Sequence, residues 1–178
     1  MSRARRSALP KSVQRKLAKY IAVAILTLFG VYTVTGETTV VDGDTLRLGK
    51  ERVRLQGIDA PESAQMCKCG GEKVYCGKIA TQALKDFIGN AKVSCDGDDR
   101  DMYGRLTAEC FVQKNGRRES VNRFMVAQGY ALAYRRYSKK FVADEERAKA
   151  EKKGVWACSF DEPWQWRRAK RGKKASKR

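Results

Sequence analysis

The chain has 178 residues, and its formal net charge of +18 comes from 38 lysines and arginines against 20 aspartates and glutamates. This length suits one domain with its own core. The sequence contains no histidine, which excludes phosphodiesterase mechanisms that use a histidine base or a phosphohistidine, and zinc sites built on histidine. Acid–base chemistry near neutral pH must then fall to carboxylates, lysine, tyrosine or metal-bound water.

The positive charge is concentrated at the two ends of the chain. Residues 1–20 contain seven lysines or arginines and no acid, and residues 164–178 contain eight and no acid. Because all 20 acidic residues lie in between, the middle of the chain has a net charge of only about +3. Basic ends suit contact with nucleic acid or anionic lipid. A solvated C-terminal tail that only aids solubility fits the composition equally well.

The N-terminal segment has the pattern of an export signal. Residues 1–20 are expected to be disordered, and a mostly apolar run follows over 20–34. A basic segment before about 15 apolar residues is typical of a signal peptide or a signal anchor, and we predict this role for residues 1–33. The best cleavage site, Val34-Thr35-Gly36, is poor, which favours an uncleaved anchor. The basic residues before the apolar run then place the N-terminus in the cytoplasm and the folded domain on the periplasmic or extracellular side. The protein is expected to be exported, and either membrane-anchored or secreted.

Three strands are predicted next. The first covers 34–41. Apolar and polar residues then alternate along 45–48 and 52–55, and a period of two is typical of strands. Residues 49–51 would connect this pair as a hairpin, and the second strand of the pair leads to a sharp stop at Pro61.

Among the charged residues in and around this hairpin, three carboxylates, Asp44, Asp59 and Glu62, and one arginine, Arg54, are the candidate site residues. The hairpin would bring Asp44, at the start of one strand, near Asp59, at the end of the other. Carboxylates repel one another at short range, so a bound cation is the simplest reason to gather them. Oxygen ligands without nitrogen or sulfur suit calcium or magnesium. Because DGD is also a common turn and Asp-Ala-Pro a common strand exit, spacing alone leaves a purely structural interpretation open.

The rest of the chain is predicted to add one helix, two strands and two further helices. Helical spacing of apolar residues predicts the first helix over 77–88, and alternation predicts strands at 91–95 and 105–112. The acidic stretch between these strands is interpreted as a turn, because it lacks the ligands that an EF-hand needs at its fifth and twelfth positions. Ser120 is a good N-cap for a short helix, and a last helix covers 141–153. Five strands with a helix after the third fit an OB-type barrel in an α+β, mainly β, fold.

The cysteines predict disulfides, because an even number follows an export-type N-terminus: Cys67, Cys69, Cys76, Cys95, Cys110 and Cys158. The preferred pairing joins Cys95 to Cys110 across one predicted hairpin. Cys76 would pair with Cys67 or Cys69, and the remaining cysteine of that loop with Cys158. A zinc site made by the three cysteines of the loop is the alternative, but their spacing offers no good fourth ligand.

Taken together, the motifs resemble the staphylococcal nuclease (thermonuclease-like) family, and in particular a cysteine-containing exported subgroup. The carriers are VVDGDTLRL, VRLQGIDAPE, DMYGR and MVAQGYALAYRRYSKKFVADEERAKAEKKGVW. The similar region runs over 34–166, which we expect to be the folded domain, followed by a basic disordered tail at 167–178. The resemblance implies a five-stranded OB-type barrel with about three helices. It also implies an enzyme, a phosphodiesterase that hydrolyses DNA and RNA with calcium and leaves 3′-phosphates.

The resemblance assigns a role to each carboxylate. It makes Asp44, Asp59 and the backbone carbonyl of Ala60 calcium ligands. It makes Glu62 the carboxylate that activates or orients the attacking water. Ala60 departs from the family's best-known members, which have threonine there, so a side-chain hydrogen bond is lost while the carbonyl ligand should survive. The cysteine-bearing loop at 63–76 lies next to Glu62 and could change substrate access.

The resemblance also implies residues that contact the substrate. Arg54 and Arg105 match two phosphate-binding arginines, although a surface ion pair is the plain alternative for each. Tyr103 and Tyr134 fall where family members place tyrosines around the nucleotide, although each could simply pack at the edge of a barrel. A base stacked on tyrosine gives little sequence specificity.

The expected partners are DNA and RNA, together with the membrane if the N-terminal segment stays uncleaved. No protein partner is implied, and a monomer is expected. Two other functions compete with the nuclease. The first is a non-catalytic OB-fold module that binds nucleic acid at the membrane. The second is a membrane-anchored surface protein whose basic ends bind anionic polymers or lipids.

Overall fold

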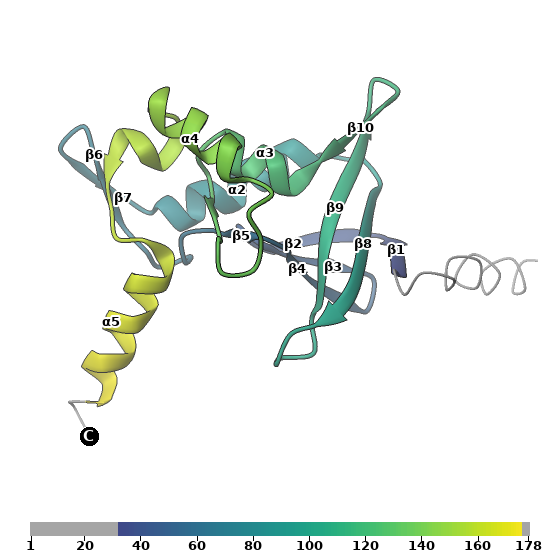
Figure 1. The fold of residues 1–178 in the computed structure, drawn as a ribbon, viewed down its shortest axis with the longest axis horizontal. Helices are drawn as coiled ribbons and strands as arrows, with labels where there is room; N and C mark the ends of the chain where they lie inside the picture. Colours follow the sequence, from purple (N-terminus) through teal and green to yellow (C-terminus); the bar gives the residue numbers. More distant parts are fainter. Residues whose placement is uncertain (1–31, 176–178) are drawn as a thin grey trace, which may run out of the picture.

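A curled sheet of seven strands dominates residues 32–175, the part of the chain that the computed structural model describes (Figure 1). Its strands are β1 (Tyr32–Gly36), β2 (Thr38–Asp42), β3 (Thr45–Leu48), β4 (Glu51–Leu55), β8 (Val93–Arg100), β9 (Leu106–Lys114) and β10 (Arg117–Ser120). The order across the sheet is β1-β8-β9-β4-β3-β2, and β10 pairs with β9. Because β1 and β2 are consecutive in the chain yet form opposite edges, the sheet has to curl back toward itself.

The alternation predicted for these strands builds the core. In β3, β4 and β9 the apolar side chains point inward, while most of the positions between them are partly or fully exposed. The buried set is Leu46, Leu48, Val53, Leu55, Leu106, Ala108, Cys110 and Val112. Because side chains alternate between the two faces of a strand, the polar residues of the same strands are left at the surface.

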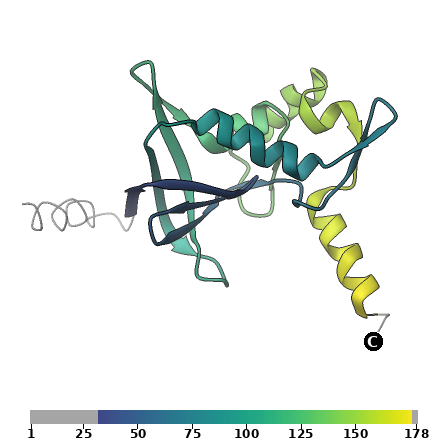
Figure 2. The same cartoon turned by 180° about the vertical axis from the view of Figure 1, so that it is seen from behind.

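Three helices cover one side of the curled sheet, and a fourth projects away from it (Figures 1 and 2). They are α2 (Cys76–Ile88), α3 (Val121–Ala127) and α4 (Val142–Ala150), then α5 (Pro163–Ala175), which follows the short 3₁₀ helix η2 (Gly154–Ala157). Helix α2 buries Ala80, Leu84 and Ile88, whose spacing of four residues places them on one face of the helix. The predicted N-cap of α3 is confirmed, because the side chain of Ser120 accepts a hydrogen bond from a backbone N–H in the first turn.

Two small sheets and three disulfides complete the fold. The strand β5 (Ile58–Asp59) pairs with β11 (Leu132–Ala133), and β6 (Cys67–Cys69) lies between β7 (Glu72–Val74) and β12 (Cys158–Ser159). The predicted pairing of cysteines is confirmed, and its open choice is decided: the bonds are Cys67–Cys76, Cys69–Cys158 and Cys95–Cys110. Since every cysteine is bonded, the alternative zinc site is not formed.

The strand predictions need two corrections. The first predicted strand is divided at Glu37 into β1 and β2, because one half pairs with β8 and the other with β3. If β1 and β2 are counted as one bent strand, this strand and β3, β4, β8 and β9 correspond to the five predicted strands. The prediction of a turn over the acidic stretch is wrong for residues 96–100, which belong to β8. Pairing with β9 overrides the weak strand preference of aspartate and glycine, through an irregularity between Gly97 and Asp99.

The predictions for the two ends of the chain have different outcomes. The disordered tail predicted for 167–178 is wrong for most of its length, because α5 is helical through Ala175. A basic helix of this length is marginal by itself, so its contacts with the body, described below, are what hold it. The predicted signal or anchor, residues 1–33, lies outside the described residues except for its last two, which belong to β1. Within residues 32–175, no helix has the length and apolar character needed to cross a bilayer.

Candidate active site

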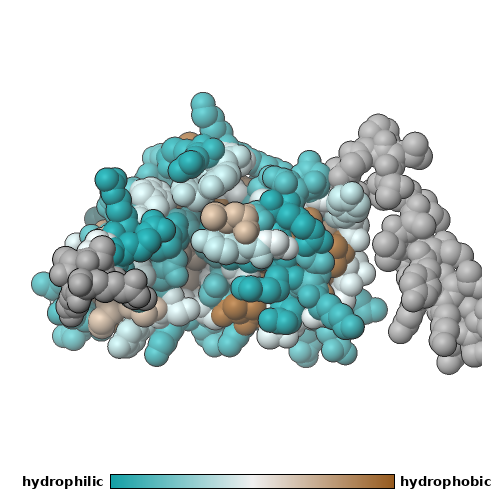
Figure 3. Space-filling view, turned by 90° about the horizontal axis from the view of Figure 1, so that it is seen from below, coloured by the Kyte–Doolittle hydropathy of each residue, from teal (hydrophilic) through white to brown (hydrophobic). Residues whose placement is uncertain are grey.

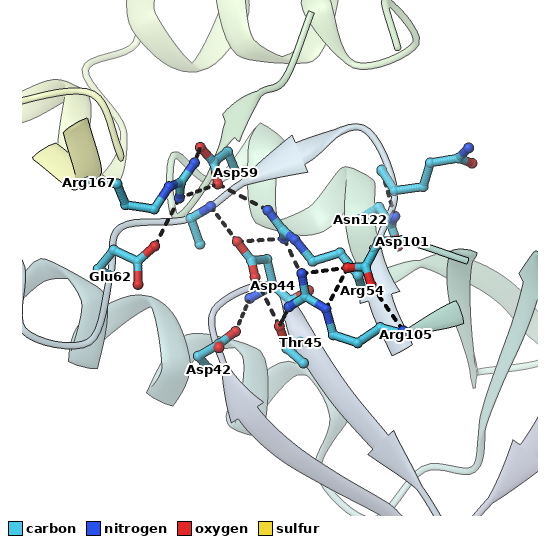
Figure 4. Close-up of polar contacts among 12 residues, drawn as sticks. Asp42, Asp44, Thr45, Arg54, Asp59, Glu62, Asp101, Arg105, Asn122 and Arg167 are labelled. Atoms are coloured by element: carbon cyan, nitrogen blue, oxygen red, sulfur yellow. Dashed lines mark hydrogen bonds and ion pairs between the residues drawn. The ribbon is translucent and has the colours of Figure 1, made fainter. Parts of the chain in front are cut away.

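The predicted carboxylates come together where the start of β3, the end of β4 and the strand β5 meet (Figure 4). The guanidinium of Arg54 lies between Asp44 and Asp59: one nitrogen is 2.6 Å from Asp44 Oδ2, and the other is 3.0 Å from Asp59 Oδ1. The hairpin brings these groups together because Thr45 is paired with Arg54 across the two strands. An arginine therefore separates the two aspartates that sequence reasoning expected to share a cation.

The side chain of Asp44 is fixed by its neighbours. Its Oδ1 accepts a hydrogen bond from the Thr45 hydroxyl at 3.2 Å, and its Oδ2 accepts one from the Ala60 backbone N–H at 3.0 Å. The backbone N–H of Asp44 donates to Asp42 Oδ1 at 3.1 Å. A Cβ on Gly43 would lie only 2.7 Å from the Ala60 side chain, so the DGD turn packs directly on the strand exit. Sequence reasoning did not select Asp42, although its place in the DGD motif was a usable signal.

The site concentrates negative charge in a poorly hydrated place. Asp59 has no exposed surface, and this burial raises the pKa of its carboxyl above the ordinary value. Burial and the charge of Asp44 raise the pKa of Asp42 to about 6. Burial opposes the charge of Arg54, yet Asp44 and Asp59 hold the pKa of its guanidinium above the ordinary value. The carboxylates therefore favour a positive group among them.

The second predicted arginine, Arg105, is held by Asp101. Its Nε and one terminal nitrogen each lie 2.7 Å from Asp101 Oδ2. The same carboxylate accepts the backbone N–H groups of Tyr103 and Arg105 at 2.9 and 3.0 Å. Although burial alone would raise it, these hydrogen bonds hold the pKa of Asp101 below its ordinary value. The remaining nitrogen of Arg105 reaches to 3.3 Å from the Thr45 hydroxyl, beside Asp44.

Glu62 meets a residue that sequence reasoning missed. Its Oε1 accepts a hydrogen bond from the guanidinium of Arg167 in α5 at 2.9 Å. The same guanidinium binds both oxygens of Asp59, at 3.0 and 2.7 Å (Figure 4). Burial opposes the charge of Arg167, but these two carboxylates raise the pKa of its guanidinium. The sequence offers only an indirect signal, since Arg167 follows Trp164 and Trp166 in a segment that was expected to be a tail.

The loop that carries Glu62 is held on two sides. The side-chain oxygen of the fully buried Gln65 accepts a hydrogen bond from the Glu62 backbone N–H at 3.2 Å. The backbone N–H of Gln65 donates to the Glu62 carbonyl at 2.7 Å. The first turn of α2 presses against the same carbonyl, because a Cβ on Gly77 would lie 1.9 Å from that oxygen. The side chain of Glu62 remains 39% exposed, so it is positioned by its backbone and still open to water.

The two predicted tyrosines differ in environment. Tyr103 is 71% exposed, and the Arg105 guanidinium carbon lies 5.5 Å from the centre of its ring. Tyr134 directly follows β11, the partner of β5, and its ring is stacked on Trp164 of α5 with 5.5 Å between centroids. An open hollow of about 350 Å³ lies beside Tyr134 and Trp164. Seen from below, the surface of the molecule is mainly hydrophilic, with a few apolar patches (Figure 3).

The donor set fits an oxygen-binding cation in part. Among the residues that the structure describes, no three acidic, cysteine or histidine side chains form a ready metal cluster. Asp44 and Asp59 supply two carboxylates, so further ligands would have to be backbone carbonyls and water, which calcium accepts. The guanidinium groups on these oxygens show that the pair already attracts positive charge.

Buried aspartates, a partly exposed glutamate and arginine forks gathered at the ends of neighbouring strands are the components of a phosphodiesterase. Comparisons with known proteins define the class further. Residues 52–158 match the family described as staphylococcal nuclease homologue, and the chain belongs to this family. The suspected family is thereby confirmed.

Relatives of the chain include proteins named as nucleases. Micrococcal nuclease of Shigella flexneri is 33% identical over 144 residues, which cover 73% of this chain and 78% of that protein. Protein ParB of Escherichia coli is 31% identical over 168 residues, or 86% and 90% of the two chains. Succinoglycan biosynthesis protein ExoI of Rhizobium meliloti (strain 1021) is 34% identical over 126 residues, or 69% of this chain and 64% of that protein. The family and the nuclease relative place this chain among the phosphodiesterases.

Proposed function

We propose that this protein is a calcium-dependent, sugar-nonspecific endonuclease that hydrolyses phosphodiester bonds in DNA and RNA and leaves 3′-phosphates. The observation that carries the proposal is the convergence of Asp44 and Asp59 on the guanidinium of Arg54, with Glu62 joined to Asp59 through Arg167. Family membership and a relative named micrococcal nuclease support it.

The proposed calcium ligands are the carboxylates of Asp44 and Asp59 and the backbone carbonyl of Ala60. The hydrogen bond from the Ala60 N–H to Asp44 keeps this stretch of backbone next to the carboxylate. Calcium bound there would neutralise charge on the phosphate and polarise it for attack. The missing threonine hydroxyl at position 60 leaves the carbonyl itself in place.

Arg54 and Arg105 are proposed to grip the phosphate oxygens. A guanidinium donates two parallel hydrogen bonds to a phosphate, which makes it a better fork than lysine. Both side chains are mostly buried, with 16% and 19% of their surface exposed, and the carboxylates that hold them fix their orientation before substrate arrives. Such preorganised donors stabilise the charge that develops as the bond to the leaving oxygen breaks.

Glu62 is proposed to accept a proton from the attacking water. Its side chain is more exposed than the two aspartates, so water can reach it, while Gln65 and Gly77 hold its backbone. A carboxylate fixed within one water molecule of the phosphate can act as the general base.

The contact between Gly77 and Glu62 gives a testable prediction. An alanine in an ordinary helix is more stable than glycine by about 0.5–1 kcal/mol. At position 77, however, the new Cβ would meet backbone atoms of Glu62 and Pro61, which cannot rotate away. We expect Gly77→Ala to destabilise the protein by about 1–3 kcal/mol and to slow hydrolysis by displacing Glu62.

Urea unfolding and the rate of DNA hydrolysis would measure the two effects. The matched control is Lys85→Ala, an exposed position on the same helix, which should leave both quantities nearly unchanged. A Gly77→Ala protein as stable and as active as the parent would show that Glu62 does not depend on this contact.

Tyr103 and Tyr134 are proposed to stack on bases of the substrate. Contacts with the phosphate backbone and stacking on π-faces do not distinguish base sequence, so we infer low sequence specificity. The three disulfides suit an oxidising environment, and we infer an exported monomer, either anchored by its N-terminal segment or secreted.

The test of this function is hydrolysis of single-stranded DNA and of RNA by the oxidised full-length protein. Cleavage of both polymers is expected with calcium and should be lost when a chelator removes it, because the cation proposed to neutralise and polarise the phosphate is then missing. Analysis of the fragment ends should find 3′-phosphates. Binding without cleavage at any calcium concentration would instead support the non-catalytic OB-fold module. Cleavage that is unaffected by the chelator would contradict the calcium role.

A further inference from the structure

The carboxylate oxygens proposed to bind calcium are already occupied by the chain itself. Arg167 binds both oxygens of Asp59 and one oxygen of Glu62. Arg54 and the Ala60 N–H share Oδ2 of Asp44. Arg54 also lies 3.0 Å from Oδ1 of Asp59, which it shares with Arg167. Of these partners, Arg54 and Ala60 belong to the sheet and the strand exit, whereas Arg167 comes from a separate helix 108 residues away from Asp59 in sequence.

The start of α5 is anchored close to this site. The disulfide Cys69–Cys158 and the pairing of β12 with β6 fix the chain just before the helix. The side chain of Gln65 donates to the Asp161 carbonyl at 2.6 Å. These attachments end before Pro163, so the beginning of α5 cannot move far from the carboxylates.

Helix α5 itself has fewer attachments to the body than the segment that precedes it. Pro163 is buried, and Trp164 stacks on Tyr134 and packs against the small buried cluster that includes Leu132 and Val155. Arg167 makes the ion pairs described above. Residues 168–173 are exposed, and α5 points away from the body (Figure 1). An element with few buried apolar contacts opens at low free energy. Helix α5 is therefore a tethered element whose inner end inserts one guanidinium into the site.

We propose that Arg167 is an intramolecular competitor of the cation, and that α5 undocks when calcium binds Asp59. This inference rests on the proposed calcium-dependent function. Both ligands are cations that need the same oxygens of Asp59, and a fully buried carboxylate has no further oxygen to offer. The guanidinium satisfies the carboxylates when calcium is scarce, and calcium has to displace it. Because α5 stays tethered through Cys158, Arg167 returns as soon as the cation leaves.

Calcium binding to four forms of the full-length oxidised protein would test this proposal. Arg167→Gln removes the competing charge, and we expect calcium to bind about 10–100-fold more tightly, the range that corresponds to losing charge-assisted hydrogen bonds. Trp164→Ala changes no charge but weakens the docking of α5, and should also tighten calcium binding. Arg168→Ala is the matched control, because it removes one exposed charge from the same helix; screening should keep its affinity within about twofold of the parent.

Isothermal titration calorimetry would give the affinities, and circular dichroism would establish that each variant is folded. In the parent, tryptophan emission should change with calcium along the same binding curve, because Trp164 leaves its stack on Tyr134. Unchanged or weaker calcium binding in Arg167→Gln would overturn the proposal. If Arg167→Gln bound calcium more tightly but Trp164→Ala had no effect, the proposed undocking of α5 would be wrong. The effect of Arg167→Gln would then come from its lost charge alone. If no form bound calcium, the calcium-dependent function would be contradicted as well. If all four forms bound calcium equally, only the competition by Arg167 would be contradicted.

Discussion

Replacing Glu62 by glutamine is expected to lower kcat for hydrolysis of single-stranded DNA by about 10²–10⁴-fold. Glutamine keeps the size of the side chain and can still accept the hydrogen bond from Arg167, but it cannot take a proton from water. Asp44 and Asp59, the proposed cation ligands, are untouched. The loss should therefore fall on the chemical step, with DNA binding close to that of the parent. Calcium affinity should be no weaker than in the parent, because the substitution also removes one ion pair of Arg167.

Single-turnover hydrolysis at saturating calcium, together with a DNA-binding measurement in the absence of cleavage, separates these effects. The control is Glu72→Gln, an exposed glutamate of β7, which should behave like the parent. If Glu62→Gln retained kcat within about threefold of the parent, Glu62 would not be the base. If it bound calcium far more weakly instead, Glu62 would belong to the cation ligands.

The parts of the fold that depend on neighbouring residues could be predicted from the sequence. Alternation gave the strands of the central hairpin, and the register follows from it, so Asp44 and Asp59 were expected together. The N-cap at Ser120 and the disulfide between the paired residues Cys95 and Cys110 are local in the same sense. These features are specified by short stretches of chain, where hydrophobic period and turn chemistry act directly.

The features that the sequence did not reveal depend on distant contacts. Residues 96–100 are rich in aspartate and become strand only because β9 offers a partner. Arg167 reaches Asp59 from 108 positions away, after a segment that Cys69–Cys158 and the pairing of β12 with β6 hold close to the site. A basic C-terminal segment has no apolar period that would indicate such a return. The proximity of the site's carboxylates and of Arg54 could thus be predicted, while their roles remain proposals, and the presence of Arg167 required the three-dimensional path of the chain.

Replacing Arg105 by lysine is expected to lower kcat/KM by about 10²–10³-fold, the loss usual for removing one donor that stabilises the transition state. The arginine uses two nitrogens to hold Asp101 and points the remaining one toward Thr45, beside Asp44. A lysine has a single ammonium group and cannot hold Asp101 and a phosphate oxygen in the same planar geometry. Charge is conserved in this substitution, so long-range attraction of the nucleic acid should persist and the deficit should appear mainly in kcat.

The matched control is Arg47→Lys, an exposed position on β3, for which kcat/KM should remain within about threefold of the parent. Steady-state hydrolysis of a short labelled DNA at several salt concentrations would measure both variants. If Arg105→Lys raised KM alone and the increase disappeared at low salt, Arg105 would act by steering the substrate rather than by gripping the scissile phosphate. If the variant matched the parent, the ion pair with Asp101 would be the whole role of Arg105, and Arg54 would be the only fork of the two left to stabilise the transition state.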